Sequence, residues 1–344
     1  MSEYAGKQFV GIDLHRRRSV IVRTTADGEV LETVQILNDV DRLRSVMANA
    51  GVDPEVVLEA TYGWYWAVDA LQDAGARVHL AHPLGVKMFE YRRVKNDVRD
   101  AADLADLLRM HRLPEAYIAT PHERELRELV RHRAKFVALR SGLKAQVHGV
   151  LAKQGLLPEV SDVFGPTGQA WLRTASLDLV YRQRIDSLLE LIDAYDGEIE
   201  LFRVMIANRL RGHRGYRVIQ QISGVGPTFA AVLVAEIGDV TRFSRPEKLC
   251  CWAGLTPRHR ESDTSVHRGP ITKQGSKLVR WAAIEACQRS TEPYLAGHKQ
   301  RIRDRRGKTA TQISKVAAAR KLLHVVYYTM RDGQARCLQA ASTG

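Results

Sequence analysis

The sequence predicts an α/β domain at the N-terminus, a helical middle with coiled-coil spacing, and a mainly α-helical C-terminal domain. Short apolar runs alternate with amphipathic stretches up to residue 118, which is typical of strands and helices in turn. Apolar residues then recur at intervals of three and four, as in paired helices, and helical stretches around Gly- and Pro-containing turns follow. We therefore expect three domains, 1–118, 119–214 and 215–335.

The elements expected in the first domain follow an informative order. Apolar runs predict strands at 9–15, 19–24, 29–36, 56–60 and 77–81, and amphipathic stretches predict helices at 41–50, 64–74 and from Val98 onward. Asp27-Gly28 provides the turn between the second and third strands, because this dipeptide tolerates positive φ angles. Three antiparallel strands, a helix and then strand-helix-strand-helix is the order of an RNase H-like fold.

Four acidic residues mark a candidate metal site in this domain. Asp13 interrupts the first buried strand, and Glu59 stands at the C-terminal end of the fourth. Ligands collect at the carboxyl ends of strands in open α/β sheets, and a buried carboxylate is costly unless it is paired or binds a metal. Asp97 and Asp100 lie three residues apart, so both project from one face of the first turn of the next helix.

The chemistry that suits these four carboxylates is Mg²⁺ binding. Hard cations prefer oxygen ligands, and two ions about 4 Å apart can act on a phosphodiester from both sides. We expect two Mg²⁺ ions, with Mn²⁺ as a substitute. The helix pair alone also fits a plain helix start, with Asp97 as the N-cap and Asp100 placed favourably against the helix dipole.

Two stretches with heptad spacing predict a pair of long helices. Their apolar seams run over positions 126, 129, 133, 136, 140, 143, 147 and 150, and over 185, 188, 192, 195, 199, 202 and 206. Leu, Phe and Val fill six positions of the first seam, and Arg133 and Arg140 fill the other two. Arginines at a seam weaken a simple zipper, so a hairpin within one chain and a coiled coil between copies are both open.

The third domain opens with Gly224-Val225-Gly226-Pro227, ahead of a helix expected over 228–237. This segment resembles the turn of helix-hairpin-helix DNA-binding motifs, in which glycines let backbone N–H groups approach phosphate and Pro begins the helix. A tight turn between packed helices is the alternative.

A polar, basic segment at 252–270 is too long for a simple connection, so we expect a functional loop there. Nucleic-acid contacts are expected from the preceding glycine turn and from Arg258, Arg260, Arg268, Lys273 and Lys277. The Arg/Lys-rich stretches at 299–308 and 315–321 either touch phosphates or form a solvated charged face.

Composition narrows the function classes. The formal net charge of +13 indicates a polyanionic partner. No membrane association is expected, because no basic amphipathic stretch stands out and no run of 18 apolar residues exists. The four cysteines lack C-x-x-C spacing, which disfavours zinc and a disulfide framework and fits a reducing cytoplasm. No secretory signal is expected at the N-terminus.

Several short motifs, in the order in which they occur along nearly the whole chain, resemble those of the DEDD transposases of the insertion-sequence one-ten family, which also includes Piv-type DNA invertases. The motifs are Gly11-Ile12-Asp13-Leu14-His15, Leu58-Glu59-Ala60-Thr61, Lys95-Asn96-Asp97-Val98-Arg99-Asp100-Ala101, Gly224-Val225-Gly226, Ala253-Gly254-Leu255-Thr256-Pro257, Glu261-Ser262 and Ile271-Thr272-Lys273-Gln274-Gly275-Ser276.

The resemblance implies a RuvC-like first domain whose acids Asp13, Glu59, Asp97 and Asp100 bind Mg²⁺, and a C-terminal transposase domain with a nucleophilic serine, Ser262. It also implies strand exchange between double-stranded donor and target DNA through a covalent phosphoserine, with sites chosen by a structured bridge RNA. A homo-oligomer, dimer or tetramer, acting at the bacterial nucleoid is expected with it.

Two positions depart from the family pattern. The family usually has Lys-Thr-Asp where this chain has Lys95-Asn96-Asp97, a change that spares the acid. It usually has Ser-Gly where this chain has Ser262-Asp263, which leaves Thr264 and Ser265 as alternative nucleophiles. A serine hydroxyl needs activation, and no local Ser-His-Asp spacing is present although His259 and His267 flank the segment. Activation by the metal site, in the same or a neighbouring subunit, is therefore expected.

Two other functions remain open. The first is a junction-resolving nuclease that uses the same four acids with water as the nucleophile and forms no covalent adduct. The second is a non-catalytic nucleic-acid-binding scaffold, for which the order of the acids would be a coincidence.

Overall fold

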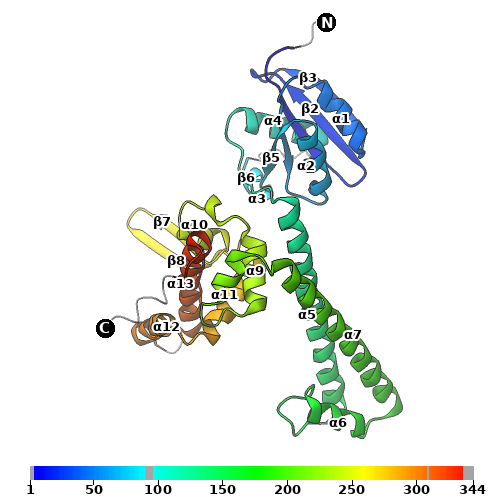
Figure 1. Cartoon of the computed structure of the whole chain (residues 1–344), viewed down its shortest axis with the longest axis vertical. Coiled ribbons are helices and arrows are strands. Elements are labelled where there is room, and N and C mark those ends of the chain that lie inside the picture. The colour runs from blue at the N-terminus through cyan, green and yellow to red at the C-terminus, as the bar shows by residue number, and fades with distance from the viewer. Residues whose placement is uncertain (1–3, 90–95, 308–309, 336–344) are drawn as a thin grey trace. The chain divides into compact units, whose positions relative to one another are not determined.

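The chain forms two compact units in a computed structural model that describes residues 4–89, 96–307 and 310–335 (Figure 1). The first unit is Met1–Ile118 and the second is Ala119–Gly344. The first is an α/β unit and the second is mostly helical, which confirms the predicted fold class at this level. The division into three domains stays a prediction.

A six-stranded mixed sheet forms the centre of the first unit. Its strand order is β3-β2-β1-β4-β5-β6, in which β1, β2 and β3 are antiparallel, β4 and β5 run parallel to β1, and β6 is antiparallel to β5. This order is consistent with an RNase H-like fold. The strands are β1 (Phe9–Leu14), β2 (Arg18–Thr24), β3 (Val30–Leu37), β4 (Glu55–Glu59), β5 (Arg77–Ala81) and β6 (Glu115–Ala116).

Helices cover both faces of this sheet. They are α1 (Val40–Ala48), α2 (Trp64–Asp73), α3 (Pro83–Val86) and α4 (Asp97–Arg109). Ile12 and Leu58 pack in a core with α1 and α2, whereas Phe9 and Val57 pack with α4. Since alternate residues of a strand point to opposite faces, Gly11, Asp13 and Glu59 belong to the face that α4 covers. The sequence did not predict β6 and α3, which are too short to leave a periodic pattern.

The contact between α4 and β1 is unusually close because of Gly11. A Cβ atom at this position would lie 1.8 Å from the carbonyl oxygen of Ala101. No side chain fits in that space, so only glycine lets the helix backbone come down onto the strand. The glycine of the first motif therefore determines how close the start of α4 lies to the end of β1.

The second unit begins with a long helical hairpin. It consists of α5 (Pro121–Lys153) and α7 (Leu179–Leu210), which pack against each other, with α6 (Pro166–Thr174) at the turn end (Figure 1). A capping box between Thr120 and Glu123 begins α5. Arg140 pairs with Asp196 across the hairpin, which shows how a seam arginine is accommodated. The two heptad stretches thus pair within one chain, and self-association stays a prediction.

The rest of the second unit is a helical bundle around α9, whose residues from Phe229 to Ile237 are all buried. No helix in the described part of the chain is long and apolar enough to span a membrane. Beyond the hairpin, the elements are α8 (Arg214–Ile219), α9 (Pro227–Ile237), the 3₁₀ helix η1 (Val240–Arg242), α10 (Pro246–Trp252), β7 (Pro257–Ser262), β8 (Ser265–Ile271), α11 (Lys277–Arg289), α12 (Pro293–Arg306) and α13 (Thr311–Asp332).

The loop predicted at 252–270 is wrong in its conformation, because most of the segment is a β-hairpin. Strand β7 pairs with β8 from Pro257 opposite Ile271 to Ser262 opposite Ser265. The residues of β7 beyond Pro257 are all exposed and polar, so they lack the alternation of apolar and polar residues that marks a half-buried strand.

Candidate active site

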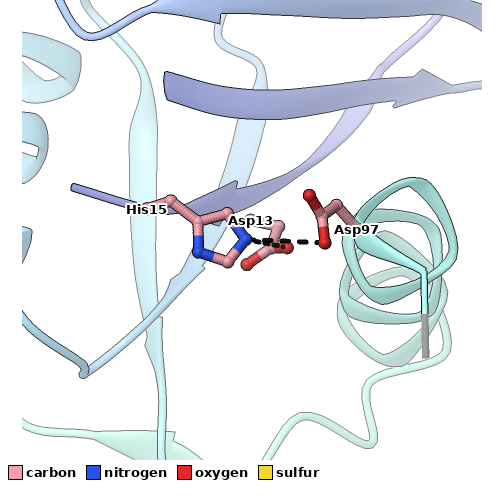
Figure 2. Close-up of side chains that lie close together, drawn as sticks. All are labelled: Asp13, His15 and Asp97. Carbon is pink, nitrogen blue, oxygen red and sulfur yellow. Dashed lines mark ion pairs between the residues drawn. The ribbon is translucent and has the colours of Figure 1, made fainter. Parts of the chain in front are cut away.

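Three side chains capable of binding a metal converge at one end of the sheet in the first unit. They are Asp13 on β1, His15 just beyond it, and Asp97 at the start of α4 (Figure 2). The Nε2 atom of His15 lies 3.1 Å from Oδ2 of Asp13 and 3.6 Å from Oδ1 of Asp97. One ligand atom from each of the three lies within 4.8 Å of the others. Residues 84 positions apart in sequence therefore share one site.

Asp97 reaches this site from the first position of α4, not from the N-cap. The N-cap is Asn96, whose Oδ1 accepts a hydrogen bond from the backbone N–H of Val98 at 2.9 Å. The prediction that Asp97 caps the helix is therefore wrong by one residue. Asparagine and threonine both cap helices well, which explains why this chain can have Asn where the family pattern has Thr. Lys95, from the same motif, lies outside the described residues.

The other two predicted acids lie nearby in the fold but outside the three-residue cluster. Ile12 of β1 pairs with Leu58 of the parallel strand β4, so Asp13 and Glu59 are the next residues on adjacent strands. Asp100 is partly buried, one turn along α4 from Asp97, whereas Val98 and Arg99 between them are exposed. The structure brings Asp13 and Asp97 within ligand distance of each other and does not include Glu59 or Asp100 in that group.

His15 was not predicted as a site residue. The available signal was its place two residues after Asp13, because residues two apart on an extended strand share a face. The backbone there is held by Asn38, whose Nδ2 donates to the carbonyl oxygen of His15 at 2.6 Å and whose Oδ1 accepts from Ser19 Oγ at 2.7 Å.

The positive charge of Arg18 adds to the surroundings of this cluster. Its Nη2 lies 3.6 Å from Oδ2 of Asp97. The donor set contains two carboxylates, and carboxylate oxygens suit Mg²⁺ and Mn²⁺. An imidazole is a better ligand for Mn²⁺ than for Mg²⁺, since Mg²⁺ prefers oxygen. The residues present therefore fit a divalent cation.

Ser262 lies at the tip of the exposed β7–β8 hairpin. It ends β7 and pairs with Ser265, whose Oγ donates a hydrogen bond to the carbonyl oxygen of Ser262 at 3.2 Å. The next residue, Asp263, has a φ of 47°, in the left-handed region that glycine adopts most easily and that aspartate tolerates. The usual glycine of the family pattern is therefore explained by the turn, and Asp263 is compatible with the same backbone.

The base of this hairpin is fixed by two glycines that cross each other. A Cβ atom on Gly254 would lie 2.1 Å from the carbonyl oxygen of Gln274, and one on Gly275 would lie 1.8 Å from that of Trp252. Both glycines also have positive φ angles. The motifs on either side of the hairpin thus pack backbone to backbone, which anchors the two strands that carry Ser262.

Arg280 of α11, which the sequence analysis missed, holds the same crossing. Its Nη1 donates hydrogen bonds to the carbonyl oxygens of Ala253 and Gly275, both at 3.0 Å. Burial lowers the pKa of this guanidinium. The signal in the sequence was an arginine among apolar helix residues with no acid three or four positions away.

Two family models match most of the chain in the order of these motifs. Residues 10–154 match the DEDD transposase model of the IS110 type, described as "Transposase", and residues 216–299 match the model described as "Transposase IS116/IS110/IS902 family". The chain belongs to the IS110 family of transposases. The family and the enzyme class predicted from the sequence are thereby confirmed.

Individual relatives of this IS110-family chain agree with that assignment. It is 26% identical over 244 residues to the transposase for insertion sequence element IS1111A of Coxiella burnetii, covering 68% of this chain and 65% of that protein. It is 29% identical over 183 residues to the 43.6 kDa protein of insertion element IS110 of Streptomyces coelicolor, covering 52% of this chain and 44% of that protein. It is 34% identical over 120 residues to the pilin gene-inverting protein of Moraxella bovis, covering 34% of this chain and 37% of that protein. These three alignments each span less than two thirds of the length of the relative named.

The residues predicted to bind nucleic acid in this family member lie in different surroundings. Gly224 has a φ of 86°, and a Cβ there would lie 2.2 Å from the carbonyl oxygen of Ala286, so this glycine serves packing. Val225 is buried in the core, whereas Gly226 is exposed with nothing near the position of a Cβ. The exposed basic residues are Arg258 and Arg260 on β7, Lys273, and Lys277 at the start of α11. The side chain of Arg268 and residue Lys308 lie outside what the structure describes.

Proposed function

We propose that this chain cuts and rejoins DNA strands as the transposase of an insertion sequence, with Ser262 as the nucleophile and Asp13, Glu59, Asp97 and Asp100 as ligands of divalent cations. The observation that carries the proposal is the convergence of Asp13 and Asp97 from β1 and α4, in a chain that matches both transposase family models. An RNase H-like fold of the first unit, with its acids at the strand ends, is part of the same proposal.

The acids of the first unit prepare a site for positive charge. Asp13 and Asp97 direct carboxylate oxygens to one place, and Glu59 and Asp100 follow on the same face of the sheet and the same helix. Bound Mg²⁺ would act as a Lewis acid on a phosphodiester and would favour an ionised nucleophile. His15 and Arg18 lie beside the two carboxylates.

Ser262 performs the covalent step of the proposal. Its Oγ forms a bond to phosphorus, one P–O bond of the DNA backbone breaks, and the departing strand oxygen takes up a proton as a hydroxyl. The number of phosphoester bonds is unchanged, so the reverse attack by a hydroxyl of another strand rejoins DNA and frees the serine. Arg260 shares a face of β7 with Ser262, since the two are two residues apart on a strand, and it can hold the phosphate under attack.

The partners proposed are double-stranded donor and target DNA, a structured bridge RNA that selects them, and further copies of the chain. The net charge of +13 and the name of the pilin gene-inverting relative support DNA. The bridge RNA rests on the resemblance to the family, and copurification of a defined RNA tests it. A dimer or tetramer is proposed because two duplexes must be handled together, and light scattering on the protein with its nucleic acid tests this.

The experiment that tests the proposed function uses the full chain, Mg²⁺ and a labelled duplex that contains the end of its element. The expected product is a protein–DNA adduct that resists denaturant, with mass spectrometry locating phosphate on Ser262. Cleavage without an adduct would identify a nuclease that uses water. Binding without cleavage would identify a non-catalytic scaffold.

A further inference from the structure

A large cleft in the second unit has no role in the function proposed above. Its volume is about 1000 Å³, and its walls come from α5 and α7 at one end of their hairpin, from the α8–α9 turn, and from α9 and α11. That volume is at the upper end of the range for small-molecule sites and exceeds what one nucleotide needs. Because all of these walls belong to one compact unit, the cleft is a property of that unit alone.

One wall of the cleft carries an exposed aromatic ring. Trp281 of α11 lines the cleft and is 43% exposed, which is unusual for so large an apolar side chain. Phe229 of α9 braces it edge to face, with ring centroids 5.1 Å apart and an interplanar angle of 77°. An exposed indole that is held in place from behind is the platform on which a nucleic-acid base stacks.

Positive charge gathers on the α5 and α7 side of the same cleft. Arg133, Arg140 and Arg203 all line it. Arg140 pairs with Asp196, and Arg203 donates to Glu200 from Nε at 2.7 Å. Arg133 has no ion pair among the described residues, and its buried Nε has no hydrogen-bond partner there. Burial, followed by repulsion from Arg140 and Arg203, lowers the pKa of Arg133, and the Glu200 carboxylate offsets this only in part. An anion beside Arg133 would relieve both effects.

The glycine turn adds a second group of donors to the cleft. Gly226 is the N-cap of α9 and makes no side-chain cap, and its φ of −75° is open to any residue. A Cβ there would meet no atom within 4 Å, so neither conformation nor packing within the chain requires glycine. Close approach of a ligand to the first turn of α9 would account for a glycine there. Helix N-termini of this kind favour phosphate groups.

We infer that this cleft holds one unpaired nucleotide of a DNA strand, with the base stacked on Trp281 and the phosphate against Arg133 and the first turn of α9. Deoxyribose is favoured over ribose, because Ala134 and Ala138 provide an apolar wall and two polar side chains of the lining, Gln220 and Ser223, are already hydrogen-bonded. Gln220 donates to the carbonyl oxygen of Tyr216 at 2.9 Å, and Ser223 bonds Thr291 at 2.9 Å. Arginines at seam positions of the helical hairpin thereby gain a function.

This inference deepens the proposed function, since strand exchange creates unpaired nucleotides, and it is tested by binding without cleavage. The full chain is titrated, without divalent metal, into a labelled duplex that carries one extrahelical 2-aminopurine deoxynucleotide and into the fully paired duplex. The expected result is about tenfold or more tighter binding of the first, with quenching of the 2-aminopurine fluorescence by stacking. Trp281→Ala should remove the preference and the quenching, and Trp281→Phe should keep most of both.

Matched controls separate the cleft from general charge and folding. Arg133→Gln and Gly226→Val should reduce the preference severalfold. Arg184→Gln, on the exposed surface of α7, and Gly212→Val, a second glycine with open space around it, should leave it unchanged. Equal binding of the two duplexes by the unaltered chain would overturn the inference even if the chain cleaves DNA. Tighter binding when the unpaired nucleotide is a ribonucleotide would also overturn it, in favour of an RNA site. A preference without cleavage would leave the inference intact and contradict the proposed function.

Discussion

The acidic cluster of the first unit and the serine hairpin of the second are held in opposite ways. Asp13 and Asp97 stand on a buried strand and on a helix whose backbone touches that strand at Gly11. Ser262 stands at the tip of a hairpin whose strand β7 is exposed at every residue beyond Pro257. The base of that hairpin is tied to the core through Gly254, Gly275 and Arg280.

The difference suggests how the two sites divide the work. A metal site needs its ligands placed to within a fraction of an ångström, which a strand and a closely packed helix can provide. A group that must enter the groove of a bulky polyanion gains from standing clear of the core. The first site should therefore be sensitive to packing changes beneath it, whereas the second should depend mainly on the side chains and the turn conformation at the hairpin tip.

The largest expected effect is the loss of Ser262 Oγ. Ser262→Ala should fold and bind nucleic acid but lose adduct formation by about 10⁴-fold or more, because the attacking atom itself is removed. Ser265→Ala and Thr264→Ala are the controls and should remain close to wild type. An adduct formed by Ser262→Ala would contradict the assignment of Ser262 as the nucleophile. If Ser265→Ala or Thr264→Ala lost the adduct instead, the substituted residue would be the nucleophile. Quantified protein–DNA adduct on a denaturing gel is the measurement.

Removal of a metal-site carboxylate should have the second-largest effect. Asp13→Asn or Asp100→Asn should reduce DNA cleavage in Mg²⁺ at least about a hundredfold, since even residues that only support metal ligands cost up to that much. Nucleic-acid binding should change little. Asp41→Asn is the matched control, as an acid in the first turn of a helix, α1, away from the site. Undiminished cleavage by the Asp13 variant would remove this residue from the metal site.

Packing beneath the first site should have a smaller, measurable effect. Gly11→Ala should lower the free energy of unfolding by about 1–3 kcal/mol, because the added methyl group meets the Ala101 carbonyl and pushes α4 away. Urea denaturation followed by circular dichroism measures this. Gly149→Ala in α5, where a Cβ meets nothing, should instead be neutral or raise stability by up to about 1 kcal/mol. Equal changes in the free energy of unfolding for the two substitutions would show that the close contact between α4 and β1 is not rigid.

The smallest effect is expected at the hairpin tip. Asp263→Gly should leave adduct formation within a few fold of wild type and change stability by less than about 1 kcal/mol, since both residues accept the left-handed φ. Asp263→Val should lower adduct formation clearly, because a β-branched residue strains this turn. If Asp263→Gly were strongly impaired, the aspartate carboxylate would have a direct role in the reaction.

The sequence predicted regular elements well where apolar periodicity was strong. The strand at 77–81 and the helices α5 and α7 appear where the pattern placed them, because each element buries its apolar residues in the core of its own unit. The hairpin of β7 and β8 was not predicted, since the residues of β7 beyond Pro257 are polar and the pairing of the strands is determined by the turn at Asp263. Element positions alone could not tell which acids meet. Which acids meet depends on how closely Gly11 lets α4 approach β1, and this distance is a property of the tertiary structure.

His15 and Arg280 are residues whose roles the sequence did not predict. Both carry polar groups whose importance comes from partners distant in the chain, Asp97 for one and the Ala253 carbonyl for the other. A single sequence contains no record of such meetings unless a motif already encodes them. The two carboxylates were predicted from their places on a strand and at a helix start, while the imidazole beside them was not.

The crossing of Gly254 and Gly275 has a consequence for how this chain can change over generations. Each glycine is blocked by a main-chain oxygen of the other segment, not by a side chain. A second-site substitution can shorten a neighbouring side chain, but it cannot remove a carbonyl. Loss of either glycine should therefore have no suppressor elsewhere in the gene. Random libraries selected for activity should keep both glycines fixed, together with Ser262 and Arg260, while the other exposed residues of β7 vary.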